Sequence, residues 1–266
     1  MSHLCGVAEL SRASFYRSLL SPQVRSESMA LRDQIQKIAL AFPAYGYRRI
    51  TEELGRRGWV VNHKRVLRLM RRDNLLCLRR KSFLRTTDSG HPFPIFPNLA
   101  ASLVPSAVNQ LWVADITYIR LQDEFVYLAV ILDAYSRRVV GWALGRTLAA
   151  ELALTALRMA LRSRRPLAGL VHHSDRGVQY ACGDYTALLA EHGLRGSMSR
   201  TGNPYDNAYA ESFIKTLKYE EVYRNDYADL AEAASSIGEF IEKIYNRQRL
   251  HSALGYRPPA EFEAAA

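Results

Sequence analysis

The sequence is poor in cysteine and has no long apolar run. Its cysteines are Cys5, Cys77 and Cys182. Because they are odd in number, far apart and form no Cys-x-x-Cys pair, they exclude a disulfide framework and a zinc ribbon, and three reduced thiols are expected. No apolar stretch is long enough to cross a bilayer, and Glu9, Arg12 and Arg17 interrupt a region where a secretory signal would be apolar. The sequence therefore predicts a cytoplasmic protein.

An excess of acidic residues is also absent. The 266 residues include 36 Lys+Arg against 26 Asp+Glu, for a net charge of +10, and 48% of them are hydrophobic. This hydrophobic content is enough for one sizeable core and a small companion domain. Residues 1–90 hold 18 basic and 7 acidic side chains, whereas residues 91–266 hold 18 and 19. A basic excess confined to the first third favours binding to a nucleic acid, although a solvated basic surface has the same composition.

The basic third has the pattern of three short helices. Apolar residues at helical spacing over 26–42 predict the first helix, and residues 47–57 predict the second. Asn62 is placed to cap a third helix over 64–74, which has apolar residues on one face and basic residues elsewhere, as a helix entering a DNA groove requires. The residues of this region expected to contact DNA are Arg48, Arg49, Lys64, Arg65 and Arg68. We therefore predict a helix-turn-helix DNA-binding region over residues 1–81.

The rest of the chain alternates between strand and helix patterns. The stretch 82–106 contains four prolines and no helical period, which indicates an interdomain linker. Strand-like runs follow at 111–121, 125–133, 137–144, 168–172 and 194–198, with helical runs at 150–163 and 185–192. We predict an α/β fold, a mixed sheet flanked by helices, over 107–225, whose first three strands form an antiparallel meander. A C-terminal helix and tail are expected over 226–266.

Three acidic residues form the candidate site. Asp115 interrupts a strand of Trp, Val, Ile and Tyr, where an uncompensated carboxylate is costly. Asp175 ends a strand, where α/β sheets usually place ligand groups, and Glu211 lies on a helix whose other face is apolar. Carboxylates delivered by a strand, a strand end and a helix suit two divalent cations held on a phosphodiester. The three residues therefore predict a metal-dependent site that cuts and joins DNA.

Basic and amide groups accompany Glu211. Lys215 and Lys218 follow it at i+4 and i+7 on the same helix face, and the polar loop before the helix would deliver Arg200 and Asn203 to that side. We expect these four side chains to contact DNA. The alternative is a surface Glu-Lys pair that only stabilises the helix, by about 0.2–0.5 kcal/mol.

Several strings of residues resemble one known family. They are Trp-Val-Ala-Asp-Ile-Thr-Tyr-Ile at 112–119, His-Ser-Asp-Arg-Gly at 173–177, and Ser-Arg-Thr-Gly-Asn-Pro-Tyr-Asp-Asn-Ala-Tyr-Ala-Glu-Ser-Phe-Ile-Lys-Thr-Leu-Lys at 199–218. Together with Tyr-Gly-Tyr-Arg-Arg-Ile at 45–50 and Tyr-Asn-Arg-Gln-Arg-Leu-His at 245–251, they resemble the catalytic frame of bacterial insertion-sequence transposases of the IS-three family, relatives of retroviral integrases.

The resemblance implies a ribonuclease-H-like integrase catalytic core and Mg²⁺ or Mn²⁺ as cofactor, with two ions when DNA is bound. It implies that Asp115, Asp175 and Glu211 are the metal ligands and catalytic residues of a polynucleotidyl transferase, which cleaves insertion-sequence ends and transfers the 3′-hydroxyl strand into target DNA. The expected partners are double-stranded DNA, further copies of the chain, and an upstream-frame helix-turn-helix protein, fused or associated. The expected location is the bacterial nucleoid.

Two other functions fit parts of the sequence. A metal-dependent nuclease would use the same carboxylates but would not join strands. A regulator without catalysis would use only the helix-turn-helix region.

Several further residues are weaker site candidates. His172 and His173 are adjacent on a strand, so at most one can reach the acidic residues, and a hydrogen-bonding role is favoured. Arg247, Arg249 and His251 could contact phosphates or offset a helix dipole, and both interpretations stay open. The strand aromatics Trp112, Trp142 and Tyr118 are expected in the core.

Overall fold

The chain forms two compact units, residues 1–80 and 81–266. The computed structural model describes residues 22–73, 75, 95–200 and 207–266, and the side chains from residue 29 onward in the first of these ranges. Cys5, Cys77, Asn203 and most of the predicted linker lie outside the described residues. The two units are described separately.

The N-terminal unit contains the three predicted helices. They are α3 (Pro22–Ala41), α4 (Tyr47–Arg56) and α5 (His63–Arg72). The core between them is made by Leu31, Ile35 and Ile38 of α3, Ile50 and Leu54 of α4, and Val66, Leu69 and Met70 of α5. As predicted, the Asn62 side chain accepts a hydrogen bond from the backbone amide of Lys64, at 2.8 Å, at the start of α5. Because α5 buries its apolar face on α3 and α4, its basic residues remain on the outside.

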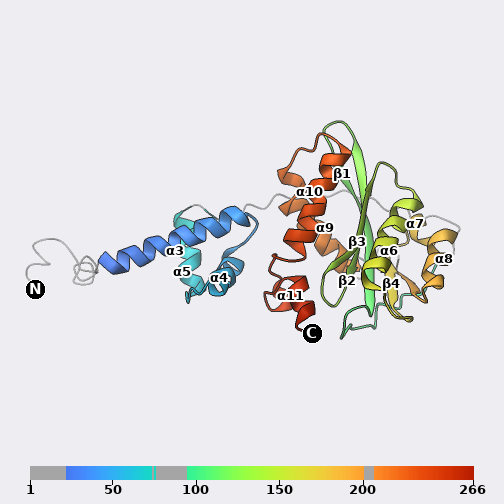
Figure 1. Ribbon diagram of the computed structural model, residues 1–266, viewed down its shortest axis with the longest axis horizontal. Helices are drawn as coiled ribbons and strands as arrows, with labels where there is room; N and C mark the ends of the chain where they lie inside the picture. Colours follow the sequence, from blue (N-terminus) through green and yellow to red (C-terminus); the bar gives the residue numbers. More distant parts are fainter. Residues whose placement is uncertain (1–21, 74, 76–94, 201–206) are drawn as a thin grey trace, which may run out of the picture. The chain divides into compact units, whose positions relative to one another are not determined.

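The second unit is built on a five-stranded sheet (Figure 1). Its strands are β1 (Leu111–Arg120), β2 (Phe125–Asp133), β3 (Val139–Gly145), β4 (Val171–Ser174) and β5 (Arg195–Met198), in the order β3-β2-β1-β4-β5. β1, β2 and β3 pair antiparallel, which confirms the predicted meander, and β4 and β5 add parallel to β1. The mixed sheet confirms the predicted α/β class.

The predicted start of the fourth strand was wrong. The apolar run from Ala168 suggested a strand over 168–172, but β4 begins at Val171. Gly169 has a φ of 98°, and its amide donates to the carbonyl of Gly193 in a turn. The strand therefore begins and ends later in the sequence than predicted, and its last residue, Ser174, directly precedes Asp175.

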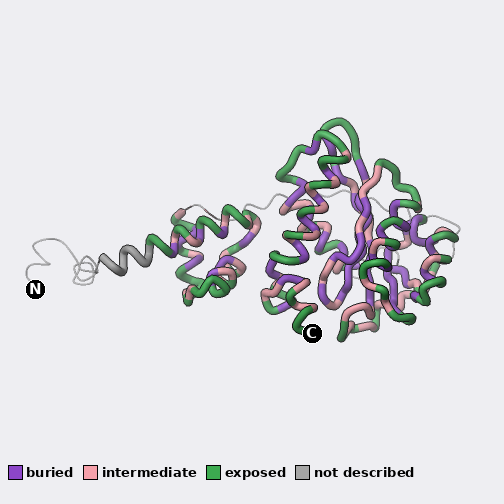
Figure 2. The backbone as a smooth tube through the Cα atoms, in the orientation of Figure 1, coloured by how far each residue is buried: buried purple, intermediate pink, exposed green. Residues whose placement is uncertain are grey.

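Helices cover both faces of the sheet (Figure 1). One face packs against α6 (Ala150–Arg164), α7 (Val178–Ala181) and α8 (Gly183–Glu191). The other packs against α9 (Ala208–Glu220), the short η2 (Val222–Arg224), and α10 (Leu230–Glu239), which continues into a π-helical segment, η3 (Phe240–Tyr245). Figure 2 shows the buried residues concentrated along the strands and the inner sides of these helices. No helix among the described residues is both long and apolar enough to cross a membrane.

α6 approaches the sheet closely because β3 carries a glycine at the contact. A Cβ at Gly141 would lie 2.2 Å from the carbonyl oxygen of Ala156, so no larger residue fits there without moving the helix. Leu157 and Ala160 of α6 are buried against this part of the sheet.

The C-terminal segment belongs to the same core. Ala233, Ile237, Phe240 and Tyr245 share one apolar cluster with β1, β2 and α9. The chain then passes through η4 (Ser252–Leu254) and ends in α11 (Pro259–Ala264).

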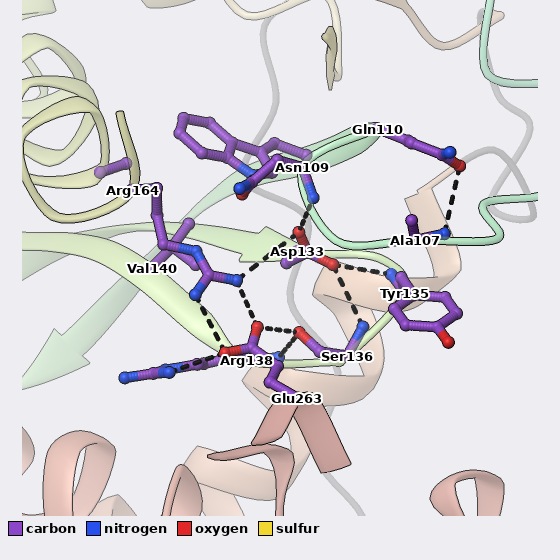
Figure 3. A network of polar contacts seen from close by, with 12 residues as sticks. Ala107, Asn109, Gln110, Asp133, Tyr135, Ser136, Arg138, Val140, Arg164 and Glu263 are labelled. Atoms are coloured by element: carbon purple, nitrogen blue, oxygen red, sulfur yellow. Dashed lines mark hydrogen bonds and ion pairs between the residues drawn. The ribbon is translucent and has the colours of Figure 1, made fainter. Parts of the chain in front are cut away.

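A network of ion pairs fastens α11 (Figure 3). The Glu263 carboxylate accepts hydrogen bonds from Ser136 Oγ and Arg138, each at 2.7 Å, and from Arg164. Asp133, beside them, accepts from the backbone amides of Asn109, Tyr135 and Ser136. The last turn of the chain is thus held to the β2–β3 connection and to the end of α6.

Candidate acidic active site

Parallel pairing places Asp115 and Asp175 near each other. β1 and β4 are in register at Val113 and His173, and both acidic residues come two positions later in their chains. Asp115 Oδ1 accepts a hydrogen bond from the Ile116 amide at 2.9 Å, and Asp175 Oδ1 accepts one from the Gly177 amide at 2.9 Å. These backbone contacts orient both carboxylates at the same end of the parallel strands.

α9 brings Glu211 to the same end of the sheet. The Nδ2 group of Asn207, directly before α9, donates to the carbonyl oxygen of Ala114 at 3.1 Å, which ties the start of the helix to the strand that carries Asp115. Phe213 and Leu217 are fully buried, whereas Glu211 lies on the solvent side of the helix. The predicted division of this helix into an apolar and a polar face is confirmed.

The charges of the other two carboxylates act on Asp115. Burial, the charge of Asp175 and the charge of Glu211 raise the pKa of Asp115 to about 8. Burial also raises the pKa of Glu211. Among the described residues, no three Asp, Glu, His or Cys side chains are gathered closely enough to hold a metal ion as they stand. The carboxylates are therefore near enough to repel each other but do not form a closed set of ligands.

Lys218 is the basic residue that faces Asp115. Burial lowers the pKa of Lys218, and the charge of Asp115 acts against this shift. Its Nζ lies 4.1 Å from the centre of the Tyr118 ring, and this ring meets Phe125 edge-on at 5.7 Å. The prediction that Tyr118 is a core residue was wrong, because the side chain is only half-buried and supports the Lys218 ammonium.

Comparison with known proteins gives a consistent picture. Two family models described as "Integrase core domain" match residues 105–204 and residues 192–259. A third, described as "HTH-like domain", matches residues 27–83. The chain is 43% identical over 264 residues to an insertion element IS600 uncharacterized 31 kDa protein of Shigella sonnei, covering 97% of both chains. It is 35% identical over 266 residues to transposase InsF for insertion sequence IS3A of Escherichia coli (strain K12), covering 98% of this chain and 92% of that one. The chain belongs to the IS-three (IS3) family of insertion-sequence transposases.

Solved structures agree on the fold of the transposase. A chain in the cryo-EM structure of the simian T-cell lymphotropic virus intasome in complex with PP2A regulatory subunit B56 gamma matches with a TM-score of 0.50 and 16% identity. The match covers 86% of this chain and 74% of that chain. The predicted integrase-type catalytic core, preceded by a helix-turn-helix domain, is confirmed, and the protein is a DNA transposase.

The two strand histidines of the transposase have hydrogen-bonding roles, as predicted. Tyr185 Oη lies 3.0 Å from His172 Nε2. The ring of His173 lies 2.8 Å from Ser197 Oγ and 3.1 Å from Ser199 Oγ. Both imidazoles are buried and engaged with neighbouring hydroxyl groups.

The C-terminal candidates differ in their surroundings. Arg249 is buried and donates two hydrogen bonds to the Glu220 carboxylate, at 2.8 and 2.7 Å, so it joins the C-terminal segment to the end of α9. The two roles considered for it, phosphate contact and dipole compensation, were therefore incomplete. Arg247 is exposed. Of the tryptophans, Trp112 is fully buried as predicted, whereas Trp142 is only half-buried and donates to Glu242.

Most of the predicted DNA contacts are on the surface. The exposed ones are Arg48, Lys64, Arg65, Arg68, Arg200 and Lys215. Arg49 is half-buried and lies over the Tyr45 ring, and Lys218 is half-buried over Tyr118. Asn203 lies outside the described residues.

Asn207 is a site residue that the sequence reasoning missed. An asparagine at a helix start usually caps the helix, but the Asn207 side chain makes no capping bond and reaches β1 instead. The signal available in the sequence, its position four residues before Glu211, predicts a local role only.

Proposed function

We propose that this transposase cuts DNA at the ends of its insertion sequence and joins the 3′-hydroxyl end to target DNA, both at the site formed by Asp115, Asp175 and Glu211. The observation that supports this most directly is electrostatic. Burial of Asp115, together with the charges of Asp175 and Glu211, raises its pKa to about 8. Holding three acidic groups in one region destabilises the fold unless a cation compensates them.

The donor set suits a divalent cation. All three candidate ligands are carboxylates, the hard oxygen donors that Mg²⁺ and Mn²⁺ prefer, and the buried histidines are engaged elsewhere. Asp115, Asp175 and Glu211 would hold two ions together with phosphate oxygens. When bound, such ions lower the pKa of an attacking water or 3′-hydroxyl and stabilise the leaving oxygen.

The chain's own residues supply orientation and phosphate binding. Asn207 ties the start of α9 to β1, which would hold Glu211 near Asp115. Lys215 and Lys218, on the Glu211 side of α9, are placed to bind phosphates next to the scissile bond. The basic face of α5 would provide further DNA contacts, and assembly of several copies on DNA and the upstream-frame partner stay predictions.

The test is an assay that separates cutting from joining. Labelled insertion-sequence end duplex, target plasmid and Mg²⁺ should yield both cleaved and joined products with the wild-type chain, and neither with Glu211→Gln. The matched control is Glu191→Gln at the exposed end of α8, which should retain both products. Cleavage without joined product would support the nuclease instead. Unchanged transposition in cells by Glu211→Gln would support a DNA-binding regulator.

The DNA contact of α5 has its own test. Arg68→Gln should weaken binding to the end duplex and reduce the slope of log affinity against log salt by about 0.9, as loss of one phosphate contact predicts. Lys37→Gln on α3 is the control, since Lys37 is paired with Asp33 at 2.7 Å. An equal change in both variants would contradict a specific role for α5.

A further inference from the structure

Tyr180 carries a buried hydroxyl without a hydrogen-bond partner among the described residues. Tyr180 lies on α7, just after Asp175, and is 3% exposed. Its hydroxyl makes no hydrogen bond with the part of the chain that the structure describes. The adjacent Tyr185 meets it edge-on at 5.4 Å between ring centres, and the Tyr185 hydroxyl is bonded to His172. Two neighbouring buried tyrosines thus differ in one respect, the partner of the hydroxyl.

A phenylalanine would serve the packing equally well. Burying a hydroxyl without a partner costs folding free energy, because its hydrogen bonds to water are lost and not replaced. The ring of Tyr180 already packs against His172 and Tyr185 in the apolar layer under α6. The hydroxyl is therefore a cost to the fold as it stands, and such groups point to a role in another state of the site.

The surroundings of Tyr180 identify that site. Burial raises the pKa of Tyr180 well above its ordinary value, and the charges of Tyr185, Asp175 and Asp115 raise it further. The hydroxyl thus stays protonated and can donate. A Cβ built on Gly177 would lie 3.0 Å from Asp175 Oδ1 and 3.6 Å from Tyr180 Cδ2. The Asp175 carboxylate and the edge of the Tyr180 ring therefore lie on either side of Gly177. The ring of Tyr180 therefore lies beside Asp175, and its hydroxyl is a buried hydrogen-bond donor within the electrostatic influence of both aspartates.

We infer that Tyr180 is a positioning residue of the transposase site, whose hydroxyl donates to the Asp175 carboxylate when a divalent cation draws the three carboxylates together. The inference rests on the proposed function. A carboxylate that binds a cation through one oxygen needs a donor for the other, and such donors orient the ligand and strengthen cation binding. Tyr180 is the buried donor beside Asp175 whose hydroxyl has no other partner among the described residues.

The experiment compares two tyrosine-to-phenylalanine variants in the full chain. Mn²⁺ uptake is followed by the electron paramagnetic resonance signal of the free ion, and thermal unfolding is measured without cations. Tyr180→Phe should unfold at the wild-type temperature or above, and its Kd for Mn²⁺ should rise about 10-fold or more, as loss of a donor behind a metal ligand typically does. Tyr185→Phe should do the opposite, unfolding at a lower temperature because His172 loses its partner, with Mn²⁺ affinity unchanged.

Asp115→Asn separates failure of this inference from failure of the proposed function. If Asp115→Asn loses Mn²⁺ uptake while Tyr180→Phe binds as the wild type does, the Tyr180 inference alone is overturned. Tyr180→Phe that unfolds at a lower temperature than wild type without cations also overturns it, because the hydroxyl then has a structural partner. If the wild type takes up no Mn²⁺, or Asp115→Asn retains uptake, the proposed metal site fails and the inference fails with it.

Discussion

Asp115 and Glu263 are both half-buried carboxylates of the second unit, but their pKa values move in opposite directions. Burial opposes the ionisation of Glu263, yet hydrogen bonds from Arg164, Ser136 and Arg138 outweigh it and lower the pKa. Burial and the charge of Asp175 raise the pKa of Asp115 to about 8. Within the part of the chain that the structure describes, Asp115 accepts a hydrogen bond from the backbone amide of Ile116, at 2.9 Å.

This difference separates two uses of a carboxylate. Glu263 has cationic partners supplied by the fold, so its charge stabilises the folded chain. Asp115 faces two other acidic groups, and the ammonium of Lys218 acts against their effect. A carboxylate left in this condition needs a cation from outside the chain, which is the physical case for a metal site.

The largest expected effect is on catalysis. Asp115→Asn should lower cutting and joining by at least about 10³-fold, because the stabilisation that a held cation supplies amounts to several kcal/mol. The same variant should not lose stability in cation-free buffer, since it removes a repelled charge. Its activity and its free energy of unfolding are measured side by side, with Asp123→Asn in the exposed β1–β2 turn as the control.

The stability of the same variant should depend on pH. The pKa of Asp115 rises from 3.8 to about 8 on folding, so between these values the folded chain retains a proton that the unfolded chain releases. Wild-type stability without cations therefore falls as pH rises through this window and is level above it. Asp115→Asn should lack this decrease of stability with pH. If the free energy of unfolding of the two proteins falls equally with pH, Asp115 does not retain a proton in the folded chain.

The next effect in size is on stability. Glu263→Gln should lower the free energy of unfolding by about 2 kcal/mol, because charge-assisted hydrogen bonds to Arg138 and Arg164 are weakened. Chemical denaturation measures it. The control is Glu239→Gln, which breaks the exposed pair with Lys243 and should cost less than about 0.5 kcal/mol. If Glu263→Gln loses most of its joining activity at a temperature where it is folded, then Glu263 does not serve stability alone, and its contrast with Asp115 is wrong.

Acid should act on Glu263 in the sense opposite to Asp115. Because the folded pKa of Glu263 lies below 4.5, its contribution is fully present above pH 4.5 and is lost as pH falls through the folded pKa. Glu263→Gln should therefore lose less stability than the wild type on acidification below pH 4.5. Unfolding curves at several pH values, recorded in the same buffer series, measure the two slopes.

The smallest effect concerns the cation that faces Asp115. Tyr118→Leu removes the ring under the Lys218 ammonium, a contact worth about 0.5–1 kcal/mol, and should lower joining about 2- to 5-fold. Tyr118→Phe retains the ring face and should behave as the wild type does. Equal losses in both variants would assign the effect to the phenol hydroxyl instead.

Local pattern was sufficient for much of the fold. The meander, the capped third helix and the two faces of α9 follow from alternation, turn residues and helical spacing, which are properties of neighbours in the chain. The prediction missed the start of β4. The amide of Gly169 donates a hydrogen bond to the carbonyl of Gly193, a residue distant in the sequence, and this contact forms the turn before the strand. Tyr118 was missed for the same reason, since its partner Lys218 belongs to another element.

The sequence by itself determined the chemical content of the proposed site, which is three acidic residues and two lysines on one helix face. It also showed that a separate basic helical region precedes the catalytic core. Only the tertiary structure decided that parallel pairing brings Asp115 beside Asp175 and that Asn207 fastens α9 to β1. It also left the buried Tyr180 hydroxyl without a hydrogen-bond partner among the described residues. Strand register and side-chain hydrogen bonds join residues distant in the chain. Their energies depend on the packed arrangement, which the local pattern of residues does not contain.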